Sequence, residues 1–181
     1  QVPLSVAVYL ATNHYDYVPD AISATSLMKP VRQAILTPRV PAEQARTDVL
    51  QLVTSRMGTS IHDGIEKAWI GGHYKQAMKD LGYPQKIIDR VVVNPEGPVE
   101  AGAIPVYMEQ RMFREIDGKK VSGRFDFIAE GRLEDFKSTS TFTWTNGTKT
   151  EDYQLQGSIY RWIDAAQPVR KITQDHMAIQ F

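Results

Sequence analysis

An acidic residue followed by glycine, Glu130-Gly131, separates two runs rich in Phe, Ile and Leu. Such a pair suits a two-residue hairpin turn, which needs positive φ angles at its centre. With a loop of that length Ala129 pairs with Arg132, and counting back along both strands sets Asp126 opposite Asp135. Paired residues share one face of a sheet, so the sequence predicts two carboxylates in close proximity there.

Opposed carboxylates destabilise a sheet unless a cation neutralises them. Lys137 follows Asp135 by two residues and therefore projects from the same face. A divalent cation with oxygen ligands would neutralise the remaining charge. The alternative is a solvated face on which acids alternate with Lys and Arg, but opposed acids are a poor way to build one. The pattern therefore predicts a metal-dependent site.

A third strand is predicted over residues 106–116, ending at the Asp117-Gly118 turn. If Ile116 pairs with Lys119, Glu109 comes to lie opposite Asp126. Glu109 then extends the row of acids across three strands. This alignment requires both turns to be two-residue loops, because a slip of one residue exchanges the two faces of a strand.

The expected apolar face of these strands carries three phenylalanines, with Phe125 opposite Phe136 and Phe127 beside them. Elsewhere the patterns predict a short strand at 6–10, a helix at 23–36 containing Pro30, and a helix from 41 or 42 to 57. A capping box at Ser60 and Asp63 would start a helix that carries His62. Residues 86–93 fit either a short helix or a buried strand, and 173–181 reads as a closing strand.

A helix is also predicted over residues 151–166, with a capping box formed by Thr148 and Glu151. Its buried face is expected to contain Leu155, Ile159, Trp162 and Ala166, with Gln156 and Tyr160 on an adjacent stripe.

Three motifs in this order, Gly123-Arg124-Phe125-Asp126, Asp135-Phe136-Lys137 and Gln156 to Tyr160, resemble the G-x-x-D, D-x-K and Q-x-x-x-Y signatures of the PD-(D/E)XK nucleases. His62, within the sequence GTSIHDGIE, is similar to the upstream histidine of one branch of that superfamily. That branch is typified by the RecB nuclease domain, its CRISPR-associated relatives and phage exonucleases. Each motif alone is weak, but four in the right order make a specific signal.

The resemblance implies an α/β (α+β) fold with a restriction-endonuclease-like αβββαβ core, in which helices flank a central mixed sheet. It implies a metal-dependent DNA nuclease, of exonuclease type, that uses one or two Mg²⁺ or Mn²⁺ ions. The implied metal ligands are His62, Asp126, Asp135 and the Phe136 carbonyl. Lys137 would position or deprotonate the attacking water, Glu109 would support a second ion or a water, and Gln156 and Tyr160 would lie near the DNA strand.

Purely structural roles, without any part in catalysis or binding, also remain open for some of the same residues. His62 could be a core-edge histidine bonded to a carbonyl, Tyr160 could pack at the core edge, and Gln156 could be solvated. At the level of function, the alternatives are a catalytically silent nucleic-acid-binding or scaffold module of the same fold, and a metal-dependent phosphoesterase acting on a small substrate. The cleavage mode, strand preference and oligomeric state are also open.

The composition of the chain limits its domain organisation, its cofactors and its binding partners. The chain has 181 residues, enough for a single domain over 1–181 with a proper core. It has no cysteine, which excludes disulfides, Cys-ligated zinc and iron–sulfur clusters. Lys plus Arg equals Asp plus Glu, at 21 each, so DNA would be held by a local basic groove and not by overall charge. A membrane partner is not expected, because no apolar run is long enough to span a bilayer and no secretory pattern opens the sequence. We therefore expect a cytoplasmic protein, in the host cytoplasm if a phage encodes it.

Overall fold

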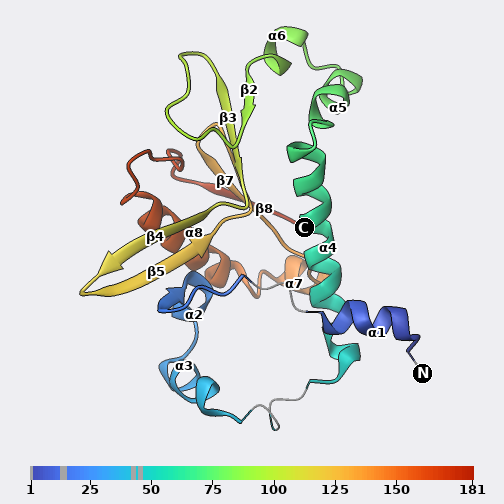
Figure 1. Ribbon diagram of the computed structural model, residues 1–181, viewed down its shortest axis with the longest axis vertical. Helices are drawn as coiled ribbons and strands as arrows, with labels where there is room; N and C mark the ends of the chain where they lie inside the picture. Colours follow the sequence, from blue (N-terminus) through green and yellow to red (C-terminus); the bar gives the residue numbers. More distant parts are fainter. Residues whose placement is uncertain (1, 13–15, 42–43, 45–46) are drawn as a thin grey trace.

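The structure is a computed structural model that describes residues 2–12, 16–41, 44 and 47–181. It is a mixed α and β protein with two sheets (Figure 1). Its α-helices are α1 Leu4–Ala11, α2 Ala24–Leu27, α3 Val31–Leu36, α4 Val53–Ile70, α5 Tyr74–Asp80, α6 Gln85–Ile88, α7 Thr141–Asn146 and α8 Thr150–Asp164. Its strands are β1 Ala21–Ser23, β2 Val91–Val93, β3 Ile104–Met108, β4 Arg111–Ile116, β5 Lys119–Arg124, β6 Phe127–Ala129, β7 Arg132–Phe136 and β8 Met177–Gln180.

The two sheets are joined by one long hairpin that bends in the middle. The smaller sheet has the order β1-β5-β4 and the larger one β2-β3-β6-β7-β8. In the smaller sheet Arg111 pairs with Arg124, and in the larger one Met108 pairs with Phe127. The register is therefore the same on both sides of the bend. Between the two ladders the Glu109 amide donates to the Asp126 carbonyl at 3.1 Å.

Both predicted turns and their registers are confirmed. Ile116 pairs with Lys119 around Asp117-Gly118, and Ala129 pairs with Arg132 around Glu130-Gly131. All four turn residues have positive φ, between 47° and 79°. The closing strand predicted over 173–181 is confirmed in its C-terminal part as β8, which runs parallel to β7 and pairs Asp135 with Ile179. The uniform strand predicted over 106–116 is instead broken into β3 and β4, because Glu109 adopts a φ of 49°.

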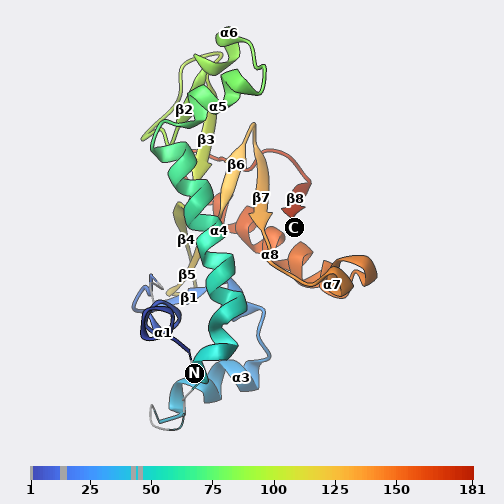
Figure 2. The same cartoon turned by 90° about the vertical axis from the view of Figure 1, so that its right-hand side faces the viewer.

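Two apolar clusters lie on opposite sides of the larger sheet. One contains Phe125 with Tyr160 and Ile163 of α8, and the other contains Phe127 with Phe136 and residues of α4 and α5. Figures 1 and 2 show α4 and α8 on opposite sides of these strands. The prediction that the three phenylalanines share one face is therefore wrong. The chain bends at Asp126, which interrupts the alternation of side chains between Phe125 and Phe127.

The N-terminal elements differ from prediction in their type and limits. Residues 6–10 belong to helix α1, whose Tyr9 hydroxyl bonds the Arg56 carbonyl. The helix predicted at 23–36 is two helices, because Pro30 cannot donate a backbone hydrogen bond; Ser23 caps α2 and α3 begins at Val31. The helix predicted from 41 or 42 falls partly on residues 42–43 and 45–46, outside the described residues. Of its described part, residues 47–48 are irregular and Val49–Leu52 form a 3₁₀ turn, while residues 53–57 are helical as predicted, as the first residues of α4.

The two long helices also need corrections. Ser60 does not start a helix, because α4 already begins at Val53 and continues through it. Helix α8 is present close to its predicted limits, but no capping box starts it. Of its predicted buried face, Ile159 and Trp162 pack against the core, while Leu155 and Ala166 are exposed. Its most buried residues include Gln156, Tyr160 and Ile163. The ambiguous segment 86–93 contains both a helix, α6, and a strand, β2. Helix α7 was not predicted.

Among the described residues, the helices are all too short or too polar to serve as a membrane span.

Candidate functional site

His62 is held against the end of strand β7 by the packing of α4. One turn before it, Gly58 lies so close to Ser138 that an added Cβ would be 2.6 Å from the serine Oγ. This approach brings His62 Nε2 to 3.0 Å from the Phe136 carbonyl, which fits an Nε2–H donor. The His62 ring also meets the Phe136 ring edge-on, with centroids 5.7 Å apart. The Nδ1 lone pair is thereby directed away from β7.

His62 Nδ1 faces two carboxylates from the bend of the long hairpin. It lies 3.7 Å from Glu109 Oε1 and 3.6 Å from Asp126 Oδ1. One ligand-type atom from each of the three residues falls within 4.8 Å of the other two. The bend creates this cluster, because it places Glu109 and Asp126 side by side at the point where the two sheets diverge.

Asp126 is in an unfavourable place for a charged group. Its Oδ2 accepts a hydrogen bond from the Phe136 amide at 2.7 Å. Even so, burial and then the nearby Asp135 carboxylate raise the pKa of Asp126 to about 7, although His62 opposes this. The Glu109 carboxylate in turn raises the pKa of His62. Without a cation, the cluster therefore retains protons that isolated carboxylates would release.

Asp135 lies next to this cluster but points toward α8. It is 1% exposed, and its Oδ2 is 2.5 Å from Lys137 Nζ. That oxygen accepts no hydrogen bond of ordinary geometry from the described residues. The other oxygen accepts from Gln156 Nε2 at 3.3 Å, and the same nitrogen donates to the Tyr160 hydroxyl at 3.0 Å. Gln156 and Tyr160 are both buried, so neither is a solvated residue of the helix surface.

The structure thus brings the eight predicted site residues into two adjoining groups. His62, Glu109 and Asp126 form the three-residue cluster. Asp135 pairs with Lys137 and accepts from Gln156 of α8, which also donates to Tyr160. The Phe136 carbonyl accepts from His62 and its amide holds Asp126. Asp135 and the Phe136 carbonyl are outside the three-residue cluster.

Arg124 is a site residue that the sequence analysis did not single out. Its Nε is 3.1 Å from Glu109 Oε2, and its side chain is 46% exposed. The sequence spacing could have identified it, because Arg124 precedes Asp126 by two residues and in a regular strand would project from the same face. Arg124, His62, Glu109 and Lys137 line one open cavity of about 370 Å³.

The donor set fits a divalent cation. Three carboxylates, those of Glu109, Asp126 and Asp135, face two permanent positive charges, those of Arg124 and Lys137. One negative charge stays uncompensated when His62 is neutral. Carboxylates with a single imidazole suit Mg²⁺ or Mn²⁺, which favour oxygen ligands. The raised pKa of Asp126 indicates a carboxylate that a cation would stabilise.

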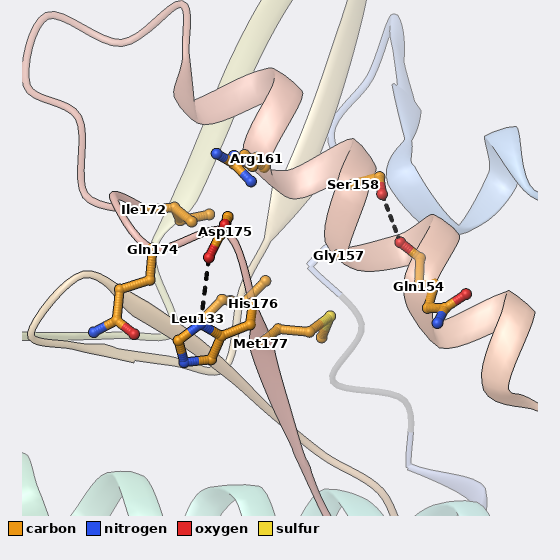
Figure 3. Close-up of a pocket in the computed structure, with 10 residues that line it drawn as sticks. All are labelled: Leu133, Gln154, Gly157, Ser158, Arg161, Ile172, Gln174, Asp175, His176 and Met177. Atoms are coloured by element: carbon orange, nitrogen blue, oxygen red, sulfur yellow. Dashed lines mark hydrogen bonds and ion pairs between the residues drawn. The ribbon is translucent and has the colours of Figure 1, made fainter.

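A separate cavity of about 520 Å³ lies along α8 and the segment that leads into β8 (Figure 3). Arg161 and His176 are its basic residues. His176 Nδ1 is 3.5 Å from Asp175, and Ser158 donates to the Gln154 carbonyl. None of the eight predicted site residues lines this cavity. The chemistry is therefore concentrated on the other side, around His62.

The chain was compared with family models, with curated proteins and with solved structures, and none of the three comparisons gave a match. A functional assignment for this chain therefore depends on the geometry of the site.

Proposed function

We propose that this protein is a metal-dependent nuclease that hydrolyses phosphodiester bonds in DNA. The observation that carries the proposal is the convergence of His62, Glu109 and Asp126 within 4.8 Å, beside the Asp135–Lys137 pair. An acid cluster with an adjacent lysine is a typical arrangement for metal-assisted hydrolysis of phosphoesters.

The order of elements around the site supports the same family of folds. Apart from α5, α6 and β2, which follow α4, and α7, which precedes α8, the order is α4, the bent strands β3–β4 and β5–β6, then β7, α8 and β8. Counting each bent strand once, this order is αβββαβ. We therefore propose that the chain has a restriction-endonuclease-like core, with α1 to α3, the α5–α6–β2 segment and α7 added around it.

In the proposed mechanism His62 Nδ1 and the carboxylates of Glu109 and Asp126 would hold the cation. A Mg²⁺ or Mn²⁺ ion held there would lower the pKa of a coordinated water and stabilise negative charge on the phosphoryl oxygens. Lys137 would position the attacking water by donating a hydrogen bond from its ammonium to the water oxygen, and the proton of that water would pass to solvent. Asp135 holds the Lys137 ammonium in place, because one of its oxygens contacts Nζ at 2.5 Å.

Two further groups act on the residues of this centre. Gln156 fixes the orientation of Asp135 by donating to its Oδ1, and Tyr160 fixes Gln156 in turn. Arg124 neutralises one oxygen of Glu109, and its exposed guanidinium is available to a phosphate of the substrate. Arg124 thus links the acid cluster to an anionic ligand.

The test is a gel assay of purified protein with Mn²⁺ on end-labelled linear DNA, single- and double-stranded, and on circular DNA. We expect degradation of linear DNA, and a loss of at least about 10²-fold in rate for Lys137→Ala, the scale of removing one positioned hydrogen-bond donor from an active site. Lys79→Ala removes an exposed lysine on α5 and serves as the matched control, with unchanged rate. If wild-type protein leaves every substrate intact, the proposal is wrong, and DNA binding without cleavage would indicate the silent module.

A further inference from the structure

Aromatic side chains form an exposed surface beside the candidate active site. Trp144 of α7 is 62% exposed and Phe181, directly after β8, is 56% exposed. Tyr153 of α8 is partly buried, with its ring centroid 6.0 Å from that of Phe181. We call Tyr153, Phe181 and Trp144 the aromatic track. In Figure 2 helix α7 projects outward next to α8 and the C-terminus.

The track is continuous with the active site. One cavity, of about 770 Å³, runs from His62 and Lys137 to Phe181. A second cavity, of about 270 Å³, is lined by Phe181 together with Tyr153, Trp144 and Lys149. Phe181 is common to both cavities, and the Lys137 ammonium lies 5.8 Å from the centre of the Tyr153 ring. A ligand that extends beyond the catalytic lysine therefore meets aromatic side chains next.

We propose that the aromatic track binds the unpaired bases of a single-stranded nucleic acid whose backbone passes Lys137. This inference rests on the proposed function, and it specifies the substrate as a single strand or an unpaired end. Aromatic side chains bind single strands by stacking on exposed base faces. In a duplex those faces are covered by the neighbouring base pairs, so a double helix cannot use the track without being opened.

The charges along the track suit a polyanion. Among the described residues that line the smaller cavity, Lys149 carries the single formal charge. Lys149 is paired with Asp152 at 2.9 Å, but both side chains are more than half exposed, so the pair can open to a phosphate. In the larger cavity the carboxylate is that of Glu134, which is already paired with Arg132.

Hydroxyl groups between the lysine and the track also suit a sugar–phosphate backbone. Residues 138–140 directly follow Lys137, and Ser138, Thr139 and Ser140 all line the larger cavity. Short hydroxyl side chains are common donors to phosphate oxygens. An apolar protein partner would leave these hydroxyls and Lys137 without acceptors on its side of the interface. A nucleic-acid strand supplies phosphates for the polar residues and bases for the aromatic ones.

The experiment measures base stacking directly and without catalysis. In EDTA, a short oligothymidylate is titrated into the protein while tryptophan fluorescence is followed, and an abasic oligonucleotide with the same phosphates is the comparison ligand. The chain has three tryptophans, and Trp69 and Trp162 are each partly buried in a core cluster. We expect oligothymidylate to quench the fluorescence, the abasic strand to quench far less, and Trp144→Phe to remove most of the quenching signal.

Affinity gives a second readout. Trp144→Ala is expected to weaken oligothymidylate binding about fivefold or more, and abasic binding hardly at all. Phe113→Ala, at an exposed position of β4 that lines neither cavity, is the matched control and should change neither affinity. A blunt duplex of the same length should compete poorly.

Four results would overturn the inference: no quenching, equal loss of affinity for both oligonucleotides in Trp144→Ala, equal competition by the duplex, or a dimer that Trp144→Ala dissociates. The last result would mean that a second copy of the chain covers the track. Failure of the nuclease proposal is separable. Base-dependent quenching without cleavage would support base binding by the aromatic track and reject the nuclease proposal. Cleavage without quenching would support the nuclease proposal and reject base binding by the track.

Discussion

At the residue scale, Asp126 determines how the site responds to protons. Its pKa in the folded protein is about 7, against an ordinary value of 3.8, because burial and Asp135 disfavour its charge. The folded state therefore binds this proton more tightly than the unfolded chain does. Stability from this proton is fully present below pH 3.8 and is lost as the pH rises toward 7. The raised pKa of His62 acts in the same direction at higher pH, since folding favours its protonated form.

We therefore predict that metal-free protein loses stability between about pH 4 and pH 7, by on the order of 3 kcal/mol. Urea unfolding in EDTA at a series of pH values measures this. Asp126→Asn should flatten the profile, because an amide keeps an acceptor for the Phe136 N–H and carries no charge. Asp175→Asn, at a side chain 87% exposed, is the control and should retain the slope. A profile for Asp126→Asn as steep as that of wild type would contradict the assignment.

The same substitution separates stability from metal binding. In EDTA near neutral pH, Asp126→Asn should melt at a higher temperature than wild type, because a repulsion between carboxylates has been removed. On addition of Mn²⁺ the wild type should gain in melting temperature by mass action, and Asp126→Asn should gain little. An unchanged melting temperature of the wild type with Mn²⁺ would count against a metal site.

The sequence was sufficient to predict which strand residues lie opposite one another. It was only partly sufficient to predict the direction in which their side chains point. Two-residue turns fixed the register, so the proximity of Glu109, Asp126 and Asp135 followed from counting. Counting could not predict how these three acids divide into two groups. The bend at Glu109 turns its side chain and that of Asp126 toward His62, while Asp135 faces α8. A positive φ at a glutamate has no sequence signal as clear as that of Asp-Gly.

At the scale of elements, the β6–β7 turn is fixed by a contact as well as by its backbone. Gly131 has a φ of +79°, and an added Cβ would clash with Thr173 Oγ1, which would be 1.9 Å away. Its carbonyl also accepts from the amides of Thr173 and Gln174. Gly118, in the β4–β5 turn, has a similar φ of +70° but open space around it. The two turns therefore form a matched pair.

We predict that Gly118→Ala lowers the free energy of unfolding by about 1 kcal/mol, because a residue with a Cβ is strained at positive φ. Gly131→Ala should cost clearly more, because the Thr173 side chain must also move aside. Urea denaturation of both variants measures the difference. Equal losses would show that the Thr173 contact adjusts freely and that only the backbone conformation matters.

Hairpins were predictable here and helix limits were not, for a physical reason. A β-turn is specified by two adjacent residues, whereas a helix end depends on packing far along the chain. Ser60 is in a good capping sequence, but α4 begins at Val53, since Leu10 and Tyr9 of α1 bond Arg56 and Ser60 and support the extra turns. Tertiary contact overrides the local signal in this case.

At the scale of the whole molecule, the site joins parts that otherwise belong to separate layers. His62 comes from α4 on one side of the sheet, and Gln156 and Tyr160 come from α8 on the other (Figure 2). Between them Asp126 is held by the Phe136 amide and by its own register with Glu109. An ion bound by His62, Glu109 and Asp126 would connect α4 to the bend of the hairpin. Its effect on stability should therefore be local before it is global.

Amide hydrogen exchange with and without Mn²⁺ tests this at residue resolution. The Glu109 amide donates to the Asp126 main-chain carbonyl and the Phe136 amide to the Asp126 carboxylate. We predict that Mn²⁺, at well above its dissociation constant, slows exchange of both amides by about tenfold or more, because it stabilises the local structure. The molecule contains its own control in Asp164, a second buried carboxylate, which accepts from the Lys171 and Ile172 amides away from the cluster. Those two amides should change much less. Equal slowing at both carboxylates would mean that Mn²⁺ stabilises the protein as a whole without binding at the cluster, and no slowing at Glu109 would remove the metal site from the proposed mechanism.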